Sequence, residues 1–244
     1  MGTEVDEQEA LLAAVEALTR YFVSDATMLD TLTRVSELAR SALGTSEQVG
    51  ITLVVDGRPG TYVFTDPEIS EVDQAQYNTG DGPCLEAYDT GEPVLIPATR
   101  TSAEHRHFCA VAADHGILSV ASFPLGTTGG RIGAMNHYAH VEHAFGPAEL
   151  ELGQRFAEQA SYLLVNAQAY WDARTLGENL QLALQSRAEI EQAKGIIMGR
   201  TGLDADGAFG LLREQSQAEN RKLRDIAEEI VRNTTTRPDP LDPA

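Results

Sequence analysis

The 244 residues are 42% hydrophobic and 23% charged, which is a globular composition and excludes a fibrous chain. No stretch approaches the ~18 consecutive apolar residues of a membrane-spanning helix. The acidic N-terminus also lacks the basic start of a signal peptide, so we expect a cytoplasmic protein with no membrane partner. The two cysteines, Cys84 and Cys109, are too few for a disulfide framework or a four-cysteine zinc site.

The formal net charge of −19 is distributed unevenly along the chain. Residues 1–171 contain 8 basic and 24 acidic residues, whereas residues 172–244 contain 10 basic and 13 acidic residues. The overall charge argues against nucleic-acid binding, because polyanions repel each other. Both lysines, Lys194 and Lys222, lie in the second part, so the acidity belongs to the first part.

Hydrophobic spacing predicts two helices at the start of the chain, one over residues 11–22 and a second that ends before Gly44. Asp25 is the expected N-cap of the second helix. Two β-branched runs, 49–55 and 61–65, flank an Asp-Gly-Arg-Pro-Gly turn and predict a hairpin.

A loop-rich middle region is expected to follow this hairpin. The elements predicted after residue 80 are a helix over 85–90, a strand over 94–96, a helix over 103–115 and a hairpin formed by 119–125 and 132–140. A long helix is expected after Pro147. Helices that flank an antiparallel sheet predict an α+β domain over residues 1–170.

The following region is predicted to be all-α. Residues 171–201 contain no proline, and their apolar positions alternate in steps of three and four, which predicts the heptad seam of a parallel homodimer. The expected seam residues are Leu176, Leu180, Ala183, Ile190 and Ile197, and Arg187 and Lys194 occupy the intervening positions. Two more helices, capped by Asp204 and Asn220, are expected before a disordered tail that begins at Thr234.

Three linked motifs in this region resemble the ANTAR family. They span Ser186–Met198, Ala208–Arg213 and Asn220–Ala227. ANTAR domains are three-helix RNA-binding output domains of bacterial transcription antitermination regulators. The resemblance implies that a dimer holds two stem-loops of a nascent mRNA together and so prevents an overlapping terminator hairpin from forming.

The N-terminal region is similar to a GAF domain, a sensory α+β module. The matching segments are 80–87, 116–120, 123–125 and 132–134. The resemblance implies a cavity for an unknown small-molecule or protein signal between the sheet and the region from Gly80 to Ala113. One departure is that many GAF domains carry an aspartate soon after the 94–96 strand, where this chain reads Pro-Ala-Thr-Arg. The expected organisation is a GAF domain over 1–170, a coiled-coil linker over 171–185, an ANTAR domain over 186–233 and a tail over 234–244.

The candidate RNA-binding residues follow from this resemblance and from charge. Sequence-specific RNA recognition mostly targets loops, and free N–H groups at a helix start favour phosphate. The candidates are Ser186, Arg187, Lys194, Gly195, Arg213, Asn220, Arg221, Lys222 and Arg224.

Structural roles remain open for several of these candidates. Arg187 and Lys194 could instead pair with glutamates of a partner helix, Asn220 could be only an N-cap, and Arg213 could be only solvated. Gly195 could permit close packing of another helix rather than of RNA.

Cysteines and histidines of the N-terminal region suggest a possible metal site. Cys84, His105, His107 and Cys109 suggest a metal site, but their spacing matches no standard zinc signature, so no metal or other cofactor is expected.

Free methionine sulfoxide reductases are GAF proteins that use cysteine chemistry. Cys84 follows Pro83 at a predicted helix start, which could lower its pKa and make it a sensor thiol, whereas Cys109 resembles a buried small hydrophobic residue. We expect a regulator that is not an enzyme. The main alternative is a signal-responsive protein-interaction module that does not bind RNA.

Overall fold

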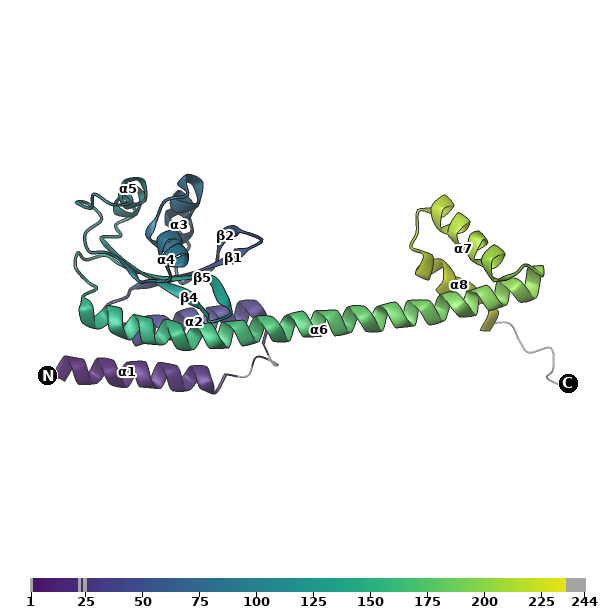
Figure 1. Cartoon of the computed structure of the whole chain (residues 1–244), viewed down its shortest axis with the longest axis horizontal. Coiled ribbons are helices and arrows are strands. Elements are labelled where there is room, and N and C mark those ends of the chain that lie inside the picture. Colours follow the sequence, from purple (N-terminus) through teal and green to yellow (C-terminus); the bar gives the residue numbers. More distant parts are fainter. Residues whose placement is uncertain (1, 22, 24–25, 236–244) are drawn as a thin grey trace. The chain divides into compact units, whose positions relative to one another are not determined.

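The computed structural model describes residues 2–21, 23 and 26–235 (Figure 1). These residues form two compact units, and the division lies between Trp171 and Asp172. Phe22 and Asp25, predicted as the end of the first helix and the N-cap of the second, lie outside the described residues.

The first unit contains a five-stranded antiparallel sheet in the order β2-β1-β5-β4-β3. The strands are β1 (Gln48–Val55), β2 (Arg58–Phe64), β3 (Val94–Ile96), β4 (Ser119–Thr127) and β5 (Gly130–Ala139). Both predicted hairpins are present, β1-β2 and β4-β5. The first turn is shorter than predicted, because Pro59 and Gly60 belong to β2. Asp56 and Gly57 both have positive φ, 51° and 73°, as a two-residue type I′ hairpin turn requires.

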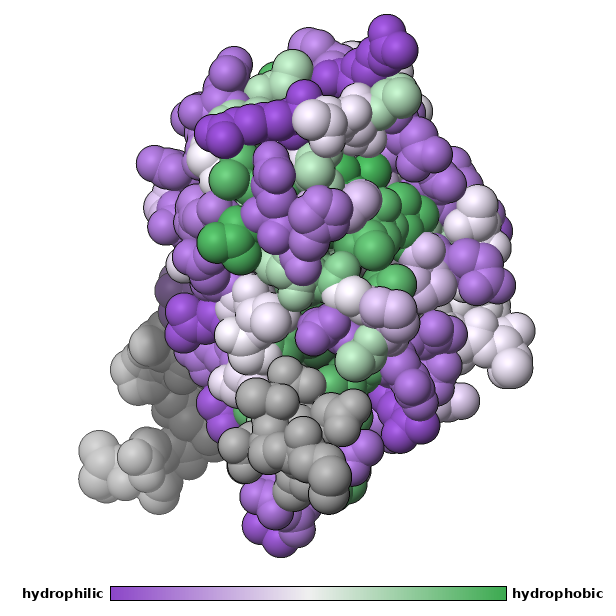
Figure 2. Space-filling view, turned by 90° about the vertical axis from the view of Figure 1, so that its left-hand side faces the viewer, coloured by the Kyte–Doolittle hydropathy of each residue, from purple (hydrophilic) through white to green (hydrophobic). Residues whose placement is uncertain are grey.

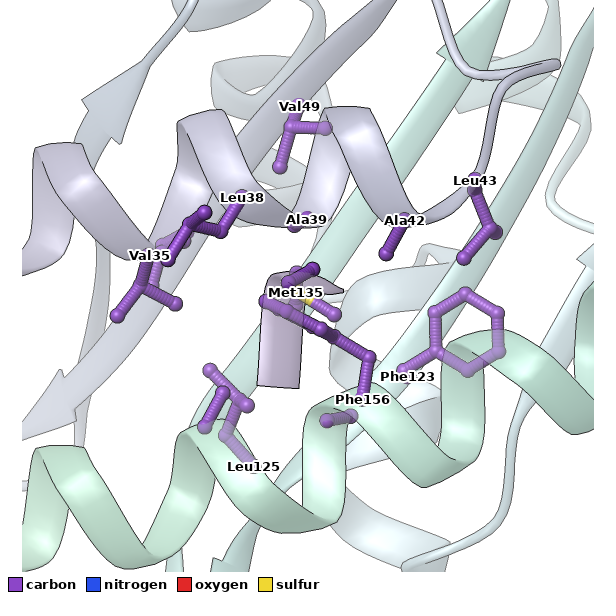
Figure 3. Packing of buried hydrophobic residues seen from close by; sticks show 14 of the residues in the cluster. Val35, Leu38, Ala39, Ala42, Leu43, Val49, Phe123, Leu125, Met135 and Phe156 are labelled. Carbon is purple, nitrogen blue, oxygen red and sulfur yellow. The ribbon is translucent and has the colours of Figure 1, made fainter. Parts of the chain in front are cut away.

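Helices cover both faces of this sheet. They are α1 (Gly2–Thr19), α2 (Met28–Ala42), α3 (Glu68–Thr79), α4 (Pro83–Thr90), α5 (Arg106–Asp114) and the first part of α6 (Pro147–Thr201). Successive residues of β5 point to opposite faces, so Met135 packs with α1, α2 and α6 while Tyr138 packs with α3 and α5. Figure 3 shows Phe156 of α6 close to Met135 and Phe123 of the sheet.

Helix α3 was not predicted, because residues 68–79 were assigned to a loop. Its buried face includes the polar side chains Asp73 and Gln76 among apolar ones, so the sequence lacks a continuous apolar stripe. Helix α2 begins with a capping box in which Thr27 accepts a hydrogen bond from the backbone N–H of Asp30, and the Asp30 carboxylate accepts one from the N–H of Thr27.

The core of the first unit also buries a histidine. His137 is fully buried, with Nδ1 2.9 Å from the Ser46 hydroxyl and its ring edge-on to those of Phe123 and Phe145. Burial lowers the pKa of His137 to about 3, so this imidazole is neutral in the folded protein.

The end-on view in Figure 2 shows hydrophilic residues around a smaller hydrophobic area.

The second unit combines the C-terminal part of α6 with α7 (Ala205–Glu219) and α8 (Leu223–Thr235). Its buried core consists of Ala193 from α6, Leu212 from α7, and Ile226 and Ala227 from α8. The three helices therefore share one small hydrophobic core.

Several predictions for this unit are tested by the structure. Asp204 caps α7 as predicted, since its carboxylate accepts a hydrogen bond of 2.8 Å from the N–H of Gly207. Asn220 was predicted to begin the last helix, but it ends α7 in the left-handed conformation with φ 50°. Ile190 and Ile197, predicted for a dimer seam, pack against the core of their own chain. Thr234, predicted to begin a disordered tail, lies inside α8, and its hydroxyl accepts a hydrogen bond from the Arg200 side chain.

The shared core predicts which leucine of α7 stabilises the second unit. Leu212 is fully buried, whereas its neighbour Leu211 is 41% exposed. Leu212→Ala should lower the unfolding free energy of this unit by about 2–5 kcal/mol, because a cavity replaces buried methyl groups. Leu211→Ala is the matched control and should change it little. Urea unfolding followed by helical circular dichroism tests this, and equal effects of the two variants would contradict the assigned core.

Candidate nucleic-acid interface and signal region

The predicted basic residues of the second unit fall into two groups. Lys194 forms an ion pair of 3.0 Å with Glu191 of the same helix, and Arg224 forms one of 3.2 Å with the adjacent Asp225. Arg221 pairs with two glutamates, Glu219 and Glu229, at 2.7 Å each. These three cations are therefore partly neutralised within their own chain, so they offer less free charge to a phosphate.

Three other cations carry free charge. Arg187, Arg213 and Lys222 are exposed, and none of them forms an ion pair within the described residues. Arg187 lies on α6, Arg213 on α7, and Lys222 directly before α8. Each helix of the unit or its N-terminal flank therefore presents at least one cation without an ion pair among the described residues, as an interface to phosphates needs.

The turn between α7 and α8 holds Lys222 in a defined place. The N–H of Arg221 donates to the carbonyl of Ser216 at 3.1 Å, and the Ser216 hydroxyl donates to the carbonyl of Arg221 at 2.5 Å. The carbonyl of Lys222 accepts the N–H groups of Asp225 and Ile226, which begins α8. Lys222 thus stands at the N-terminus of a 13-residue helix, where the helix dipole also favours an anion.

Gly195 lies on α6 where no other described segment packs against it. A Cβ atom at Gly195 would meet no other atom within 4 Å, and the residue is exposed on α6. No described helix of the chain uses this glycine for close packing, and the close approach of RNA or of a helix from a second copy stays a prediction.

Ser186 and Arg224 line one groove of about 220 Å³ between α6 and α8. Three carboxylates, those of Glu189, Asp225 and Glu228, line the same groove. Because these negative charges outnumber the single arginine, the groove is unsuited to a phosphate. The structure therefore does not place all the predicted RNA-binding residues on one basic surface.

In the first unit, a buried polar network fills part of the region where a signal cavity was expected. The fully buried Asp73 carboxylate accepts hydrogen bonds from the Tyr138 hydroxyl at 2.5 Å, from Thr61 at 2.7 Å and from the Gln76 amide at 2.9 Å. The side-chain amide oxygen of Gln76 accepts a hydrogen bond of 3.0 Å from the backbone N–H of Cys84. This network joins α3 to the sheet and to the start of α4. Sequence analysis does not predict it, because its central residue Asp73 lies in a segment expected to be a loop.

Two neighbouring side chains in this region have buried polar atoms that lack a partner. The Asn136 amide nitrogen donates to Thr52 at 3.3 Å, but its oxygen has no hydrogen-bond partner among the described residues, and neither has the hydroxyl of Ser122. Ser122 and Asn136 are paired across β4 and β5. The interior here is therefore polar and only partly satisfied.

Cys84 does not have the environment of a sensor thiol. Its side chain is buried, and burial raises the pKa of this thiol to about 12, whereas a lowered pKa was predicted. The start of α4 should lower the pKa of Cys84, but two larger effects raise it. Burial removes water from the thiolate, and the negative charge of Asp73 lies nearby. Cys109 is buried, as predicted for a small hydrophobic residue.

The histidines near the cysteines do not join them in a metal site. The ring nitrogens of His105 lie 2.5 Å from the Asp81 carboxylate and 2.7 Å from that of Glu86. His107 is exposed, and the described part of the chain contains no group of three or more histidine, cysteine or acidic side chains that could hold a metal ion. His105 thus links α5 to α4 and to the loop before it.

The buried carboxyl predicts a pH dependence of stability. Burial raises the pKa of Asp73 from 3.8 to about 6, so the folded state holds a proton that the unfolded state releases between these values. Relative to Asp73→Asn, which stays neutral, the wild-type protein should lose up to about 3 kcal/mol of unfolding free energy as the pH rises from 4 to 7. Urea unfolding of both proteins across this range tests the expectation.

The comparison with Asp73→Asn is necessary because His137 also changes the pH dependence of stability. Its lowered pKa has the opposite effect, because the unfolded state takes up a proton as the pH falls below 6.5. Both proteins retain His137, so the difference between them isolates Asp73. Parallel pH profiles would show that Asp73 is ionised in the folded state.

Comparisons with known proteins agree with this two-part organisation. A GAF domain model matches residues 25–165, and an ANTAR domain model matches residues 178–231. No match was found among curated protein sequences. In the described part of the chain, every helix falls short of the length and apolarity needed to cross a membrane.

Solved structures share the fold of the first unit. A free methionine-R-sulfoxide reductase from Neisseria meningitidis is 17% identical, with a TM-score of 0.53, over 67% of this chain and 91% of that chain. The reduced form of the fRMsr of Staphylococcus aureus is 16% identical, with a TM-score of 0.50, over 65% of this chain and 94% of that chain. At these identities the likeness concerns the fold alone.

The GAF match covers more than half of the chain, and the ANTAR match covers the three helices that share the core of the second unit. The chain therefore belongs to the GAF domain family and carries a C-terminal ANTAR domain, the combination found in RNA-binding regulators under the control of a sensory domain.

Proposed function

We propose that the chain is a transcription antitermination regulator. Its ANTAR domain would bind two adjacent stem-loops of a nascent mRNA, one per copy of a homodimer, and its GAF domain would adjust this binding in response to a small-molecule or protein signal. The proposed boundaries are 1–170 for the GAF domain, 171–185 for the linker and 186–235 for the ANTAR domain, because α8 continues through residues 234 and 235, where the tail was predicted to begin.

The observation that carries this proposal is the set of unneutralised cations on the ANTAR unit. Arg187, Arg213 and Lys222 are exposed without an ion pair in the described part of the chain. The net charge of residues 172–244 is only −3, against −16 for residues 1–171. A small unit with few free cations suits a short RNA loop better than a long duplex, because it can contact only a few phosphates.

RNA binding is tested with the full-length protein and an RNA that carries two adjacent hairpins, with a single hairpin and duplex DNA as controls. We expect the paired hairpins to bind most tightly. Lys222→Glu should weaken binding roughly tenfold and lower the salt dependence by about one phosphate contact.

Arg58→Glu in the first unit is the matched control for Lys222→Glu, since it changes the net charge by the same amount and Arg58 is exposed. Equal losses in the two variants would point to a general charge effect rather than to an RNA contact at Lys222.

A second prediction concerns the bare backbone at Gly195. Gly195→Ala should raise the unfolding free energy by up to about 1 kcal/mol, because the helix gains propensity and the new methyl group meets no neighbour. It should also weaken RNA binding if RNA contacts this backbone closely. Gly199→Ala, where a Cβ also meets no neighbour, should stabilise the helix similarly and leave RNA binding unchanged. Unchanged RNA affinity of the Gly195 variant would remove this residue from the interface.

A protein-interaction module remains the second candidate function, and one groove favours it. The groove has a volume of about 470 Å³ and lies on the ANTAR unit beside Ile197, Leu211 and Ile230, with Arg200 and Glu214 also lining it. Apolar grooves of this kind accept partner helices. Leu211→Lys should abolish binding of such a partner but leave RNA binding unchanged, whereas Lys222→Glu should have the opposite pattern.

A further inference from the structure

A continuous series of hydrogen bonds links the buried carboxyl of Asp73 on α3 to the centre of the sheet. Thr61 of β2 donates to Asp73 Oδ2 at 2.7 Å, and the Tyr77 hydroxyl lies 2.7 Å from the Thr61 oxygen. Tyr77 also lies 2.7 Å from the Thr52 hydroxyl of β1, which accepts a hydrogen bond of 3.3 Å from the Asn136 amide nitrogen of β5. We call Thr61, Tyr77, Thr52 and Asn136 the polar chain.

The ionised carboxylate of Asp73 fixes the direction of every bond in the polar chain. A carboxylate only accepts hydrogen bonds, so the single hydroxyl proton of Thr61 points to Asp73. Tyr77 must then donate to Thr61, and Thr52 must donate to Tyr77, because each hydroxyl has one proton. The Thr52 oxygen accepts from the Asn136 nitrogen, which leaves the buried Asn136 amide oxygen without a partner among the described residues.

A proton that binds to Asp73 fits at one of its two carboxyl oxygens. Oδ1 accepts from the Tyr138 hydroxyl and from the Gln76 amide nitrogen, and this nitrogen can only donate. In the described part of the chain, Oδ2 accepts from Thr61 alone, and a hydroxyl can change from donor to acceptor. The protonated acid therefore donates from Oδ2 to Thr61.

We propose that the polar chain is a switch whose direction is reversed by a proton at Asp73. When Oδ2 binds the proton, each hydroxyl of the polar chain turns about its C–O bond and keeps its own proton. Thr52 then donates toward Asn136, whose amide rotates so that its unpartnered oxygen accepts this hydrogen bond. Proton binding at α3 thus changes a side chain on β5 inside the GAF domain. This proposal does not depend on RNA binding.

The surroundings of Asp73 place the change near neutral pH. Burial raises the pKa of Asp73 to about 6, although three hydrogen bonds favour its carboxylate. The titratable groups beside it are Tyr77 of α3, Tyr138 of β5 and Cys84 of α4, and Cys84 is also near Thr52 and Asn136 of the polar chain. Burial raises the pKa of all three groups, so they stay neutral while Asp73 titrates.

His115, at the end of α5, titrates in a similar range and has to be separated from Asp73. The Val111 carbonyl and the Glu71 carboxylate raise the pKa of His115 above 6.5, and its Nε2 lies 3.2 Å from Glu71 of α3. The Glu71 side chain is 77% exposed, so this pair faces solvent rather than the buried polar chain. Asp73→Asn retains the pair, and this variant therefore separates the two titrations.

Nuclear magnetic resonance of the full-length protein tests the switch. With ¹⁵N-labelled asparagine and ¹³C-labelled aspartate, the Asn136 side-chain amide and the Asp73 carboxyl carbon are followed from about pH 4 to about pH 8. Both signals should change with one shared midpoint of about 6. In Asp73→Asn, which donates to Thr61 at every pH, the Asn136 signal should stay at its low-pH position.

Two tyrosine variants separate the polar chain from a general effect of the Asp73 charge. Tyr77→Phe interrupts the polar chain, so Asp73 should still titrate while the Asn136 signal no longer follows it. Tyr138→Phe is the matched control, because it removes a hydrogen bond to Asp73 but leaves the polar chain intact. This control should raise both midpoints together, since the carboxylate loses a donor. Thr61→Val interrupts the polar chain one step nearer to Asp73 and should uncouple the signals as Tyr77→Phe does.

Three results would overturn the proposal. The first is an Asn136 signal in the wild-type protein that does not follow Asp73, or an Asp73 carboxyl that does not titrate in this range. The second is an Asn136 signal that still follows Asp73 in Tyr77→Phe and Thr61→Val. The third is an Asn136 signal that still titrates in Asp73→Asn, which would assign the change to His115.

Discussion

One small hydrophobic core joins three helices of the second unit, and the C-terminal part of α6 depends on it. Ile190 and Ile197 of α6 pack against this core but are only partly buried by it, so part of each side chain stays open to solvent. The core is small, with four fully buried residues, and removing two of its supporting isoleucines would expose much of it. The stability of the second unit therefore depends on these few contacts between α6, α7 and α8.

Charge within the second unit is arranged so that only some cations can serve a polyanion. Lys194 and Arg221 hold glutamates of their own chain, whereas Arg187 and Lys222 have no such partner among the described residues. Exposed ion pairs add little stability, so their main effect here is to reduce the charge offered to RNA. The strongly acidic first unit adds a repulsive field that would act on any nucleic acid, and a weakly charged interface would then depend on specific contacts.

The main elements of both units could be predicted from sequence periodicity and turn residues, and the failures have physical causes. Helix α3 was missed because Asp73 and Gln76 are buried polar residues that interrupt its apolar stripe. Asn220 was assigned to the wrong helix end because asparagine favours both N-caps and the left-handed C-terminal position. The heptad pattern did not indicate that Ile190 and Ile197 pack against α7 and α8, because the spacing of apolar residues along one helix does not show which helix they contact.

The polar network of the GAF domain limits how a signal can act on its interior. Asp73, Tyr138, Thr61 and Gln76 satisfy one another, so a molecule that enters there must replace their hydrogen bonds or leave buried groups unpaired. Gln76 also holds the N–H of Cys84 at the start of α4. Displacing Gln76 would therefore free the first turn of α4 as well as the Asp73 carboxyl. A displacement of the Gln76 side chain would therefore break hydrogen bonds of both α3 and α4, which lie on the same face of the sheet as α5.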